Sequence, residues 1–114
     1  IEDARKLGLS KTEALAINNL GNTYFETNRN NKAEQCWKTA LGLFTRIDGI
    51  DSSSAMIPAT NLTNLLSRNG RFREAASSLN ELLPRVEKIY GREHDKTIHI
   101  VDKLARVEYR LRQF

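Results

Sequence analysis

The feature that most constrains the fold of this chain is an internal repeat. Residues 19–22 (Asn-Leu-Gly-Asn) align with residues 61–64 (Asn-Leu-Thr-Asn) at an offset of 42, and a third copy begins at residues 104–105. Such self-similarity is typical of a chain built from stacked copies of one supersecondary unit. At this offset, small residues align with small ones and large apolar residues align with large ones. The aligned positions include Asn28 and Gly70, Ala33 and Ala75, Trp37 and Leu79, Phe44 and Val86, and Gly49 and Gly91.

Each copy is expected to fold as two α-helices. Ile17, Leu20 and Tyr24 recur at helical spacing and predict a packing stripe. The helical period resumes after an asparagine-rich break at residues 28–31, because asparagine tolerates turns. No segment shows the alternation of a β-strand. The predicted helices lie at about residues 1–8, 12–28, 31–48, 54–69, 72–90 and 95–113.

Short turns between consecutive helices predict antiparallel pairs, and each pair needs the next one to cover its open apolar face. The predicted fold class is therefore all-α, an α-solenoid of about two and a half helix-pair repeats in a single domain over residues 1–114. Residues 1–8 would close an upstream helix, residues 12–49 would form the first repeat and residues 54–91 the second. Residues 95–114 would form the first helix of a third repeat.

The composition is that of a folded domain. Hydrophobic residues make up 39% of the 114 residues and charged residues 28%, which excludes a disordered tail. No apolar run approaches the ~20 residues of a membrane-spanning helix. Cys36 is the single cysteine, so no internal disulfide can form and a reducing intracellular compartment, the cytoplasm by default, is expected. Because the sequence starts at Ile1 rather than at methionine, we expect a domain of a longer protein.

The repeated positions resemble the tetratricopeptide repeat (TPR). The first copy matches the residue pattern of that family. The matching residues are Ile17, Leu20, Gly21, Tyr24, Ala33, Trp37 and Ala40. The second copy departs from it at Thr63, where the pattern has glycine or alanine. The resemblance implies a superhelix of helix pairs that binds other proteins and has no catalytic activity of its own.

The period and the joint between repeats resemble the kinesin light chain subtype of this family. The usual TPR period is about 34 residues, whereas the offset here is 42. Residues 90–97 (Tyr-Gly-Arg-Glu-His-Asp-Lys-Thr) follow the joint of the subtype, with Asp95 in place of its proline. This subtype occurs in many unrelated proteins, so the resemblance predicts the fold without selecting a biological role.

Asparagines recur on the surface expected to line the concave side of the stack. Residues that flank the predicted packing stripe are Asn18, Asn19, Asn22 and Phe25, and the repeat adds Asn61 and Asn64. An amide offers both a donor and an acceptor, which suits a site that holds the backbone of an extended peptide. The resemblance implies the same role for the first asparagine of each repeat. The alternative is that these amides bridge neighbouring helices.

Four cations are expected to converge on the same surface toward its C-terminal end. They are Arg68 of the second repeat and Lys103, Arg106 and Arg110 of the last helix. Guanidinium groups match carboxylates in geometry and charge. We therefore expect a partner protein with an acidic segment, extended or helical. The alternative is a solvated charged face, since the net charge of the chain is only +4.

The sequence contains no motif typical of an enzyme, and it predicts no cofactor, metal or small-molecule substrate. His94 and His99 lack an accompanying set of acidic or cysteine ligands. RNA binding by helical repeats is an alternative, although repeats that read RNA bases one by one have a shorter period than this chain. Nucleic acid is therefore not the predicted partner, and no contact of this domain with a membrane is expected.

Two alternatives concern the biological role. The chain resembles the repeat domain of FLU-type chloroplast regulators, which restrain tetrapyrrole and chlorophyll synthesis by binding glutamyl-tRNA reductase. That resemblance would imply a membrane-associated chloroplast protein with this domain on the soluble side. Separately, the last helix has no partner helix and should expose Ile100, Val101, Leu104 and Leu111, which a homodimer or a partner helix could cover.

Overall fold

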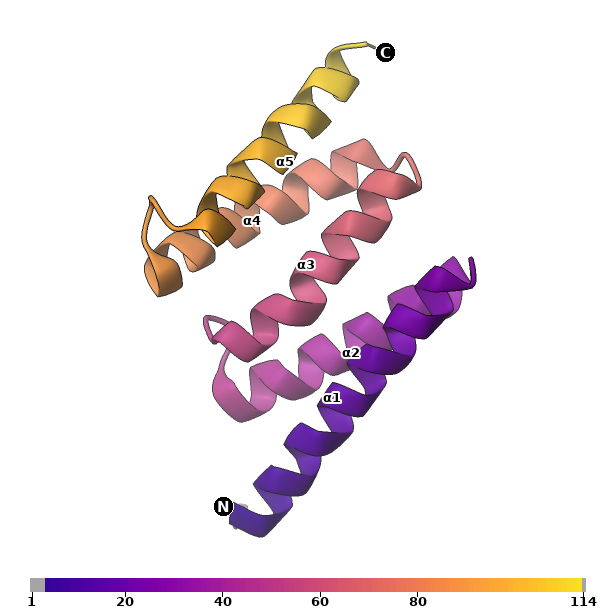
Figure 1. Ribbon diagram of the computed structural model, residues 1–114, viewed down its shortest axis with the longest axis vertical. Coiled ribbons are helices and arrows are strands. Elements are labelled where there is room, and N and C mark those ends of the chain that lie inside the picture. Colours follow the sequence, from indigo (N-terminus) through magenta and orange to yellow (C-terminus); the bar gives the residue numbers. More distant parts are fainter. Residues whose placement is uncertain (1–3, 114) are drawn as a thin grey trace. The chain divides into compact units, whose positions relative to one another are not determined.

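The computed structural model describes residues 4–113, and the side chains of residues 10–113. The described residues form five α-helices (Figure 1). These are α1 (Ala4–Glu26), α2 (Asn30–Asp48), α3 (Ser53–Arg68), α4 (Phe72–Tyr90) and α5 (Asp95–Arg112). The predicted all-α helical-repeat fold is confirmed.

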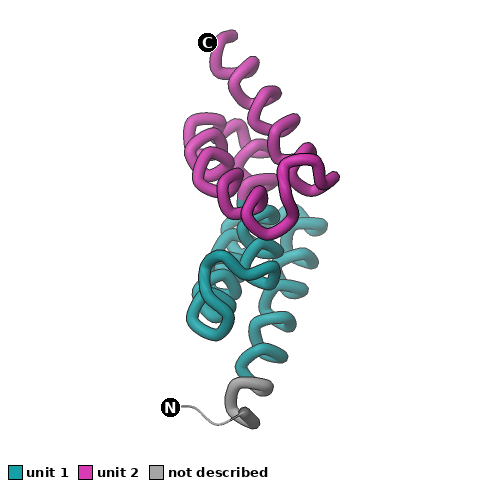
Figure 2. The backbone as a smooth tube through the Cα atoms, turned by 90° about the vertical axis from the view of Figure 1, so that its left-hand side faces the viewer, with its two compact units in different colours: residues 1–62 teal, residues 63–114 magenta. Residues whose placement is uncertain are grey.

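The chain divides into two compact units, Ile1–Leu62 and Thr63–Phe114 (Figure 2). Unit 1 contains α1, α2 and the first part of α3. Unit 2 contains the rest of α3 together with α4 and α5. Within unit 1, α1 packs along α2, and within unit 2, α4 packs along α5.

The first helix differs from its prediction. The sequence predicts a break between residues 8 and 12, but α1 runs without interruption from Ala4 to Glu26. A glycine inside a helix costs only about 1 kcal/mol relative to alanine, so Gly8 does not end the helix while the residues on both sides of it favour one. Residues 1–3 of the predicted upstream helix lie outside the described residues.

The turn between the two helices of a repeat has the same backbone geometry in both copies. Asn28 and Gly70 occupy equivalent positions and have φ values of 62° and 76°. The following amide then closes the turn, since Arg29 N donates to Tyr24 O at 2.7 Å and Arg71 N donates to Leu66 O at 2.9 Å. Positive φ favours glycine and is tolerated by asparagine, which explains why these two residue types exchange at this position.

The core of unit 1 is built around the close approach of Gly21 and Trp37. A Cβ atom added to Gly21 would lie 2.6 Å from Trp37 Nε1 and 2.8 Å from Trp37 Cδ1. The indole is 2% exposed, and its Nε1 donates a hydrogen bond to the backbone oxygen of Asn18 at 3.1 Å. Phe25 lies against the same ring with a centroid separation of 5.4 Å. The glycine therefore lets α1 approach α2 to within the thickness of an indole ring.

This contact rotates α1 away from the orientation predicted for it. Residues that share the Gly21 face, namely Ala14 and Asn18, are buried. Leu20, predicted to belong to the packing stripe, is 46% exposed, and Ile17 and Tyr24 are only half-buried. The predicted stripe is wrong because the smallest residue, not the largest, faces the bulky side chain of the next helix.

The second repeat fills the equivalent position differently. Thr63 replaces the glycine and Leu79 replaces the tryptophan, and both side chains are fully buried. Thr63 on α3 is larger than the glycine it replaces, and Leu79 on α4 is smaller than the tryptophan it replaces. The combined volume of the two side chains is therefore similar in both repeats. The rest of the unit 2 core includes Leu82, Val86 and Val107.

The joint before α5 is held by local polar contacts. His94 is the N-cap of α5, and its Nδ1 accepts a hydrogen bond from Lys96 N at 3.1 Å. Thr97 Oγ1 donates to Gly91 O at 2.6 Å. The imidazole also lies 4.8 Å from the ring of Tyr90. These residues fix where α5 begins and therefore which of its side chains face α3.

Candidate partner-binding site

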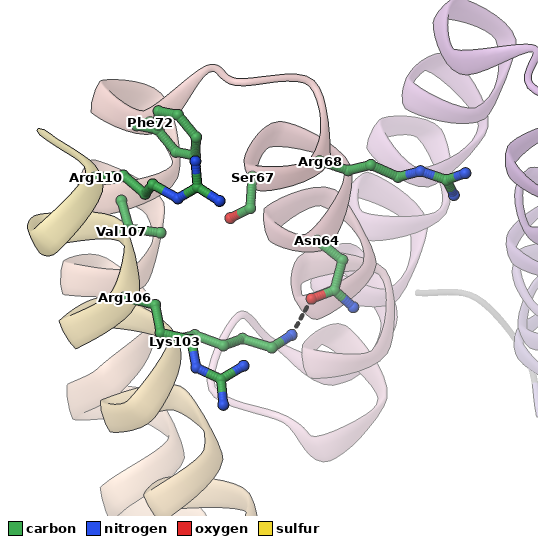
Figure 3. Close-up of a pocket in the computed structure, with 8 residues that line it drawn as sticks. All are labelled: Asn64, Ser67, Arg68, Phe72, Lys103, Arg106, Val107 and Arg110. Carbon is green, nitrogen blue, oxygen red and sulfur yellow. Dashed lines mark hydrogen bonds between the residues drawn. The ribbon is translucent and has the colours of Figure 1, made fainter. Parts of the chain in front are cut away.

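A hollow in unit 2 lies between α3 and α5, with the start of α4 at one end (Figure 3). Its volume is about 350 Å³. This volume falls at the small end of the range of ligand sites in proteins, which is about 300–1,000 Å³. The lining residues are Asn64, Ser67, Arg68, Phe72, Lys103, Arg106, Val107 and Arg110.

All four cations that the sequence predicts as partner contacts line this hollow, together with Asn64. Lys103, Arg106 and Arg110 follow one another at helical spacing on α5, so a single helix presents three positive charges to one side. Arg68 comes from the last turn of α3, and its side chain extends away from the α5 residues (Figure 3). The structure therefore places Lys103, Arg106 and Arg110 on one side of α5 with Asn64 opposite them, whereas Arg68 lines the hollow from α3 but points away from this group.

Apolar residues form the part of the hollow that the sequence does not predict. Val107 is 4% exposed, and Phe72 is half-buried at the first position of α4. The guanidinium of Arg110 lies over the Phe72 ring, with 5.9 Å between Cζ and the ring centroid, which is within cation–π range. Phe72 was missed because its equivalent in the first repeat is Asn30, so the repeat gives no signal at this position.

Lys103 is the most buried cation of the hollow. Its ammonium donates a hydrogen bond to Asn64 Oδ1, across the gap between α5 and α3. Desolvation by burial lowers the pKa of Lys103 below its ordinary value, because a charged amine loses hydration there. A neutral amide compensates this loss only in part, so an anion placed beside the ammonium would gain from the low local dielectric.

The hollow differs in charge balance from the rest of the described surface. Several cations elsewhere pair with carboxylates, as Lys11 does with Asp48 at 3.2 Å and Arg71 with Glu74 at 2.7 Å. Within residues 10–113, by contrast, no carboxylate lies within ion-pair distance of Lys103, Arg106 or Arg110, and none lines the hollow. The result is a local concentration of positive charge in a concave site.

The asparagines of unit 1 form a bridge between helices. Asn61 Nδ2 on α3 donates to Asn18 Oδ1 at 3.2 Å and to Asn22 Oδ1 at 3.4 Å on α1. Asn18 is 4% exposed, while Asn22 and Asn61 are half-buried. The amides therefore connect α1 to the middle of α3, which is the alternative stated above, a bridge between neighbouring helices.

One of the predicted partner contacts of unit 1 is placed in the core by the rotation of α1. Asn18 is 4% exposed, so the prediction that it faces a partner is corrected. Phe25 is half-buried against Trp37 and keeps part of its surface toward solvent. Asn19 is exposed on α1, where it is open to contact with another molecule.

The apolar surface of α5 also differs from its prediction. Ile100 is buried at 3% exposure, whereas Leu104 and Leu111 are half-buried. The exposed apolar side chains of α5 are Ile98 and Val101, each 46% exposed, and Tyr109, which is 65% exposed. In the first two repeats, the residues equivalent to Ile98 are Ala14 and Met56, and both are buried.

Comparison of the sequence with models of protein families identifies its family. A model of the family described as tetratricopeptide repeat matches residues 12–88. The chain belongs to the tetratricopeptide repeat family. No curated protein matches the sequence closely enough to count as a relative.

Membership of the tetratricopeptide repeat family explains both the architecture and the kind of activity. Repeats of this family generally mediate protein–protein interactions and typically have no catalytic activity. The two matched repeats include α3, which contributes Asn64, Ser67 and Arg68 to the hollow. None of the helices in residues 4–113 combines the length and hydropathy that a transmembrane span requires.

Proposed function

We propose that this tetratricopeptide repeat domain is an adaptor or regulator that binds an acidic segment of a partner protein in the hollow between α3 and α5. The observation that carries the proposal is the group of four cationic lining residues, with no carboxylate among the residues that line the hollow. A surface that concentrates one sign of charge attracts ligands of the other sign and speeds their association.

The side chains of the hollow suit a polypeptide segment in two ways. The guanidiniums of Arg106 and Arg110 match carboxylates in a paired geometry. Phe72 and Val107 offer apolar surface to the aliphatic part of an acidic residue or to its neighbour along the segment. Acidic side chains alone would be held by screened surface charges, and the apolar wall adds contacts that salt does not weaken.

In unit 1 the proposed contacts are fewer than those predicted. Asn19 is exposed, so its amide remains a proposed contact to the backbone of a bound segment. Asn22 and Asn61 are only half-buried and keep a share of surface toward solvent while they bridge α1 and α3. The half-buried Phe25 also remains a proposed contact, whereas the buried Asn18 is no longer proposed as one.

The proposal is tested with a short, glutamate-rich peptide as probe, measured by titration calorimetry at physiological salt. Arg106→Glu reverses one charge at the hollow and should weaken binding by about tenfold or more, since hydrogen bonds to charged groups contribute about 1.5–3 kcal/mol. The matched control is Arg112→Glu, the same change on the same helix at an exposed position outside the lining. Equal loss in both variants, or no binding of the peptide to the unmodified protein, would refute the proposal.

The subtype and the role within the family are part of the same proposal. The offset of 42 residues supports assignment to the kinesin light chain-like subtype, which occurs in proteins of many roles. Regulation of tetrapyrrole synthesis by binding glutamyl-tRNA reductase, in the FLU-type manner, is the more specific alternative for a chloroplast protein. A pull-down with purified glutamyl-tRNA reductase tests it directly, and absence of binding would remove that alternative.

A second candidate function is self-association through α5. Ile98, Val101 and Tyr109 are exposed on this helix, whereas the positions equivalent to Ile98 in the first two repeats are buried. A second copy that covers them would make the chain a homodimer. Light scattering coupled to size-exclusion chromatography should then give a dimer mass that Val101→Glu converts to a monomer mass. A monomer at micromolar concentration would exclude this candidate.

RNA binding is a third candidate, and the cations of the hollow are the observation that favours it. It requires a continuous basic track along which phosphates can lie. In unit 1, two of the exposed cations are paired with carboxylates, Lys11 with Asp48 and Lys38 with Glu34. A gel shift with single-stranded RNA at physiological salt tests this candidate, and it is excluded if the RNA does not move.

A further inference from the structure

The hollow between α3 and α5 has more positive charge than one carboxylate can balance. Four of its eight lining residues are cationic and none of the eight is acidic. Within residues 10–113, no carboxylate lies within ion-pair distance of Lys103, Arg106 or Arg110. Three of the cations, Lys103, Arg106 and Arg110, follow one another at helical spacing and lie along one side of α5. In Figure 3 the Lys103 side chain reaches toward Asn64, and the Arg110 guanidinium lies near Ser67. Bringing like charges together is unfavourable, and a ligand with a single negative charge would relieve it only in part.

The donors of the hollow also approach it from two sides. The cations Lys103 and Arg110 come from α5, while Asn64 and Ser67 face them from α3 (Figure 3). A carboxylate has two oxygens in one plane. A phosphate monoester has three terminal oxygens and a charge of about −1.5 to −2 at neutral pH, so it can accept hydrogen bonds from both helices at once. The arrangement of donors therefore suits the phosphate better.

The size of the hollow leads to the same conclusion. Its volume of about 350 Å³ corresponds to roughly a dozen water molecules, at about 30 Å³ of liquid volume each. One carboxylate would fill little of this space and leave the ammonium of Lys103 beside water. A phosphorylated side chain, together with the peptide backbone that carries it, fills more of it and brings its oxygens closer to the half-buried ammonium.

We infer that the hollow recognises a phosphorylated serine or threonine within an acidic segment of the partner protein, so that phosphorylation of the partner controls its binding. The inference rests on the proposed function, because it specifies the anchor of the segment that binds there. Lys103 and Arg106 would contact the phosphate oxygens, and Arg110, held over the ring of Phe72, would be positioned to form a bidentate contact. The neighbouring acidic residues of the segment would meet Arg68 at the rim.

The experiment uses three fluorescent probe peptides of one acidic sequence that differ only at the central position, which is phosphoserine, glutamate or serine. Fluorescence anisotropy at physiological salt gives the dissociation constant of each. We expect the phosphoserine peptide to bind about tenfold or more tightly than the other two, which corresponds to about 1.4 kcal/mol. A single-stranded RNA of similar charge serves as a competitor.

Two variants locate the binding. Lys103→Gln removes the half-buried ammonium and should abolish the preference for phosphoserine, whereas Arg112→Gln, outside the hollow on the same helix, should leave it unchanged. Far-UV circular dichroism verifies that both variants fold. Because Lys103 also bonds to Asn64, Arg106→Gln, at an exposed position, serves as a second variant that leaves this bond in place, and it should also reduce the preference.

The outcomes separate the two proposals. If the glutamate and phosphoserine peptides bind equally and both depend on Lys103, the phosphate inference is overturned while the proposed function stands. If no peptide binds, both fail. If the RNA displaces the phosphoserine peptide at equal concentration, the hollow is a general polyanion site and the inference is overturned. A phosphoserine preference that the two hollow variants remove and Arg112→Gln retains supports it.

Discussion

The contact between Gly21 and Trp37 predicts that Gly21→Ala destabilises the protein when Trp37 is present and stabilises it when Trp37 is replaced by leucine. Gly21→Ala adds one methyl group at a position where the new Cβ would lie 2.6 Å from Trp37 Nε1. The indole has little freedom to move, because it is 2% exposed and is held by its hydrogen bond to the backbone oxygen of Asn18. The alanine therefore has to displace either the ring or the helix.

The expected magnitude is the balance of three terms. Alanine is favoured over glycine inside a helix by about 1 kcal/mol. Overpacking a well-filled core costs about 1–3 kcal/mol, and loss of the indole hydrogen bond adds about 1 kcal/mol. Overpacking and loss of the hydrogen bond together outweigh the helix propensity, so Gly21→Ala should lower the free energy of unfolding by about 1–3 kcal/mol. The same substitution would stabilise a helix with no neighbour at this position.

Trp37→Leu provides the matched background. It introduces the residue type that the second repeat has at the equivalent position, Leu79 beside Thr63. With the ring gone, Gly21→Ala should no longer clash and should stabilise the protein by up to about 1 kcal/mol. The double-mutant cycle should thus give a coupling energy of about 2–4 kcal/mol. For independent sites, the effects of two substitutions on the free energy of unfolding add to within ~0.5 kcal/mol.

The assay is urea denaturation of the four proteins, followed by circular dichroism at the helical minimum so that loss of the tryptophan does not remove the signal. Equal slopes against urea would indicate that the same surface is exposed on unfolding in each protein. The reasoning fails if Gly21→Ala stabilises the protein that contains Trp37, or if the two substitutions are additive. Either result would mean that α1 shifts on α2 at little cost.

Three further predictions concern polar groups. Asn61→Ala should lower the free energy of unfolding by about 1–3 kcal/mol, because it leaves the buried amide of Asn18 without its donor, and a chemical melt in which the variant equals the unmodified protein would contradict the bridge. Asp48 accepts a hydrogen bond from Ser54 at 2.7 Å and pairs with Lys11, and both contacts lower its pKa below the ordinary value of an aspartate. The stabilisation by these contacts is therefore present at neutral pH and is lost as the pH falls through the lowered pKa. Asp48→Asn should lower the free energy of unfolding by less than about 1 kcal/mol at neutral pH and should have no effect in strong acid. Burial lowers the pKa of Lys103, which means that its charge opposes folding at neutral pH and that this penalty fades as the pH rises through the lowered pKa. Lys103→Met should accordingly retain the stability of the unmodified protein in a thermal melt at neutral pH, and a clear loss would show that the bond to Asn64 outweighs desolvation.

The sequence by itself determines the repeated architecture of the chain and much of the basic hollow. Helical periodicity is local, so the predicted helices after α1 agree with the structure to within one residue at each end. The turns follow from Asn28 and Gly70, because a positive φ restricts the residue type. Lys103, Arg106 and Arg110 share a side of one helix, so their convergence needs no knowledge of the remaining fold.

Only the tertiary structure decides which side of each helix is covered. The packing of Gly21 against Trp37 rotates α1, and this rotation places Asn18 in the core and makes Asn61 a bridge between helices. The packing of α4 along α5 likewise brings Phe72 to Arg110. The physical reason is that periodicity fixes the positions of side chains around a helix axis, whereas the angle at which the helix meets its neighbour depends on the shapes of side chains far away in the sequence.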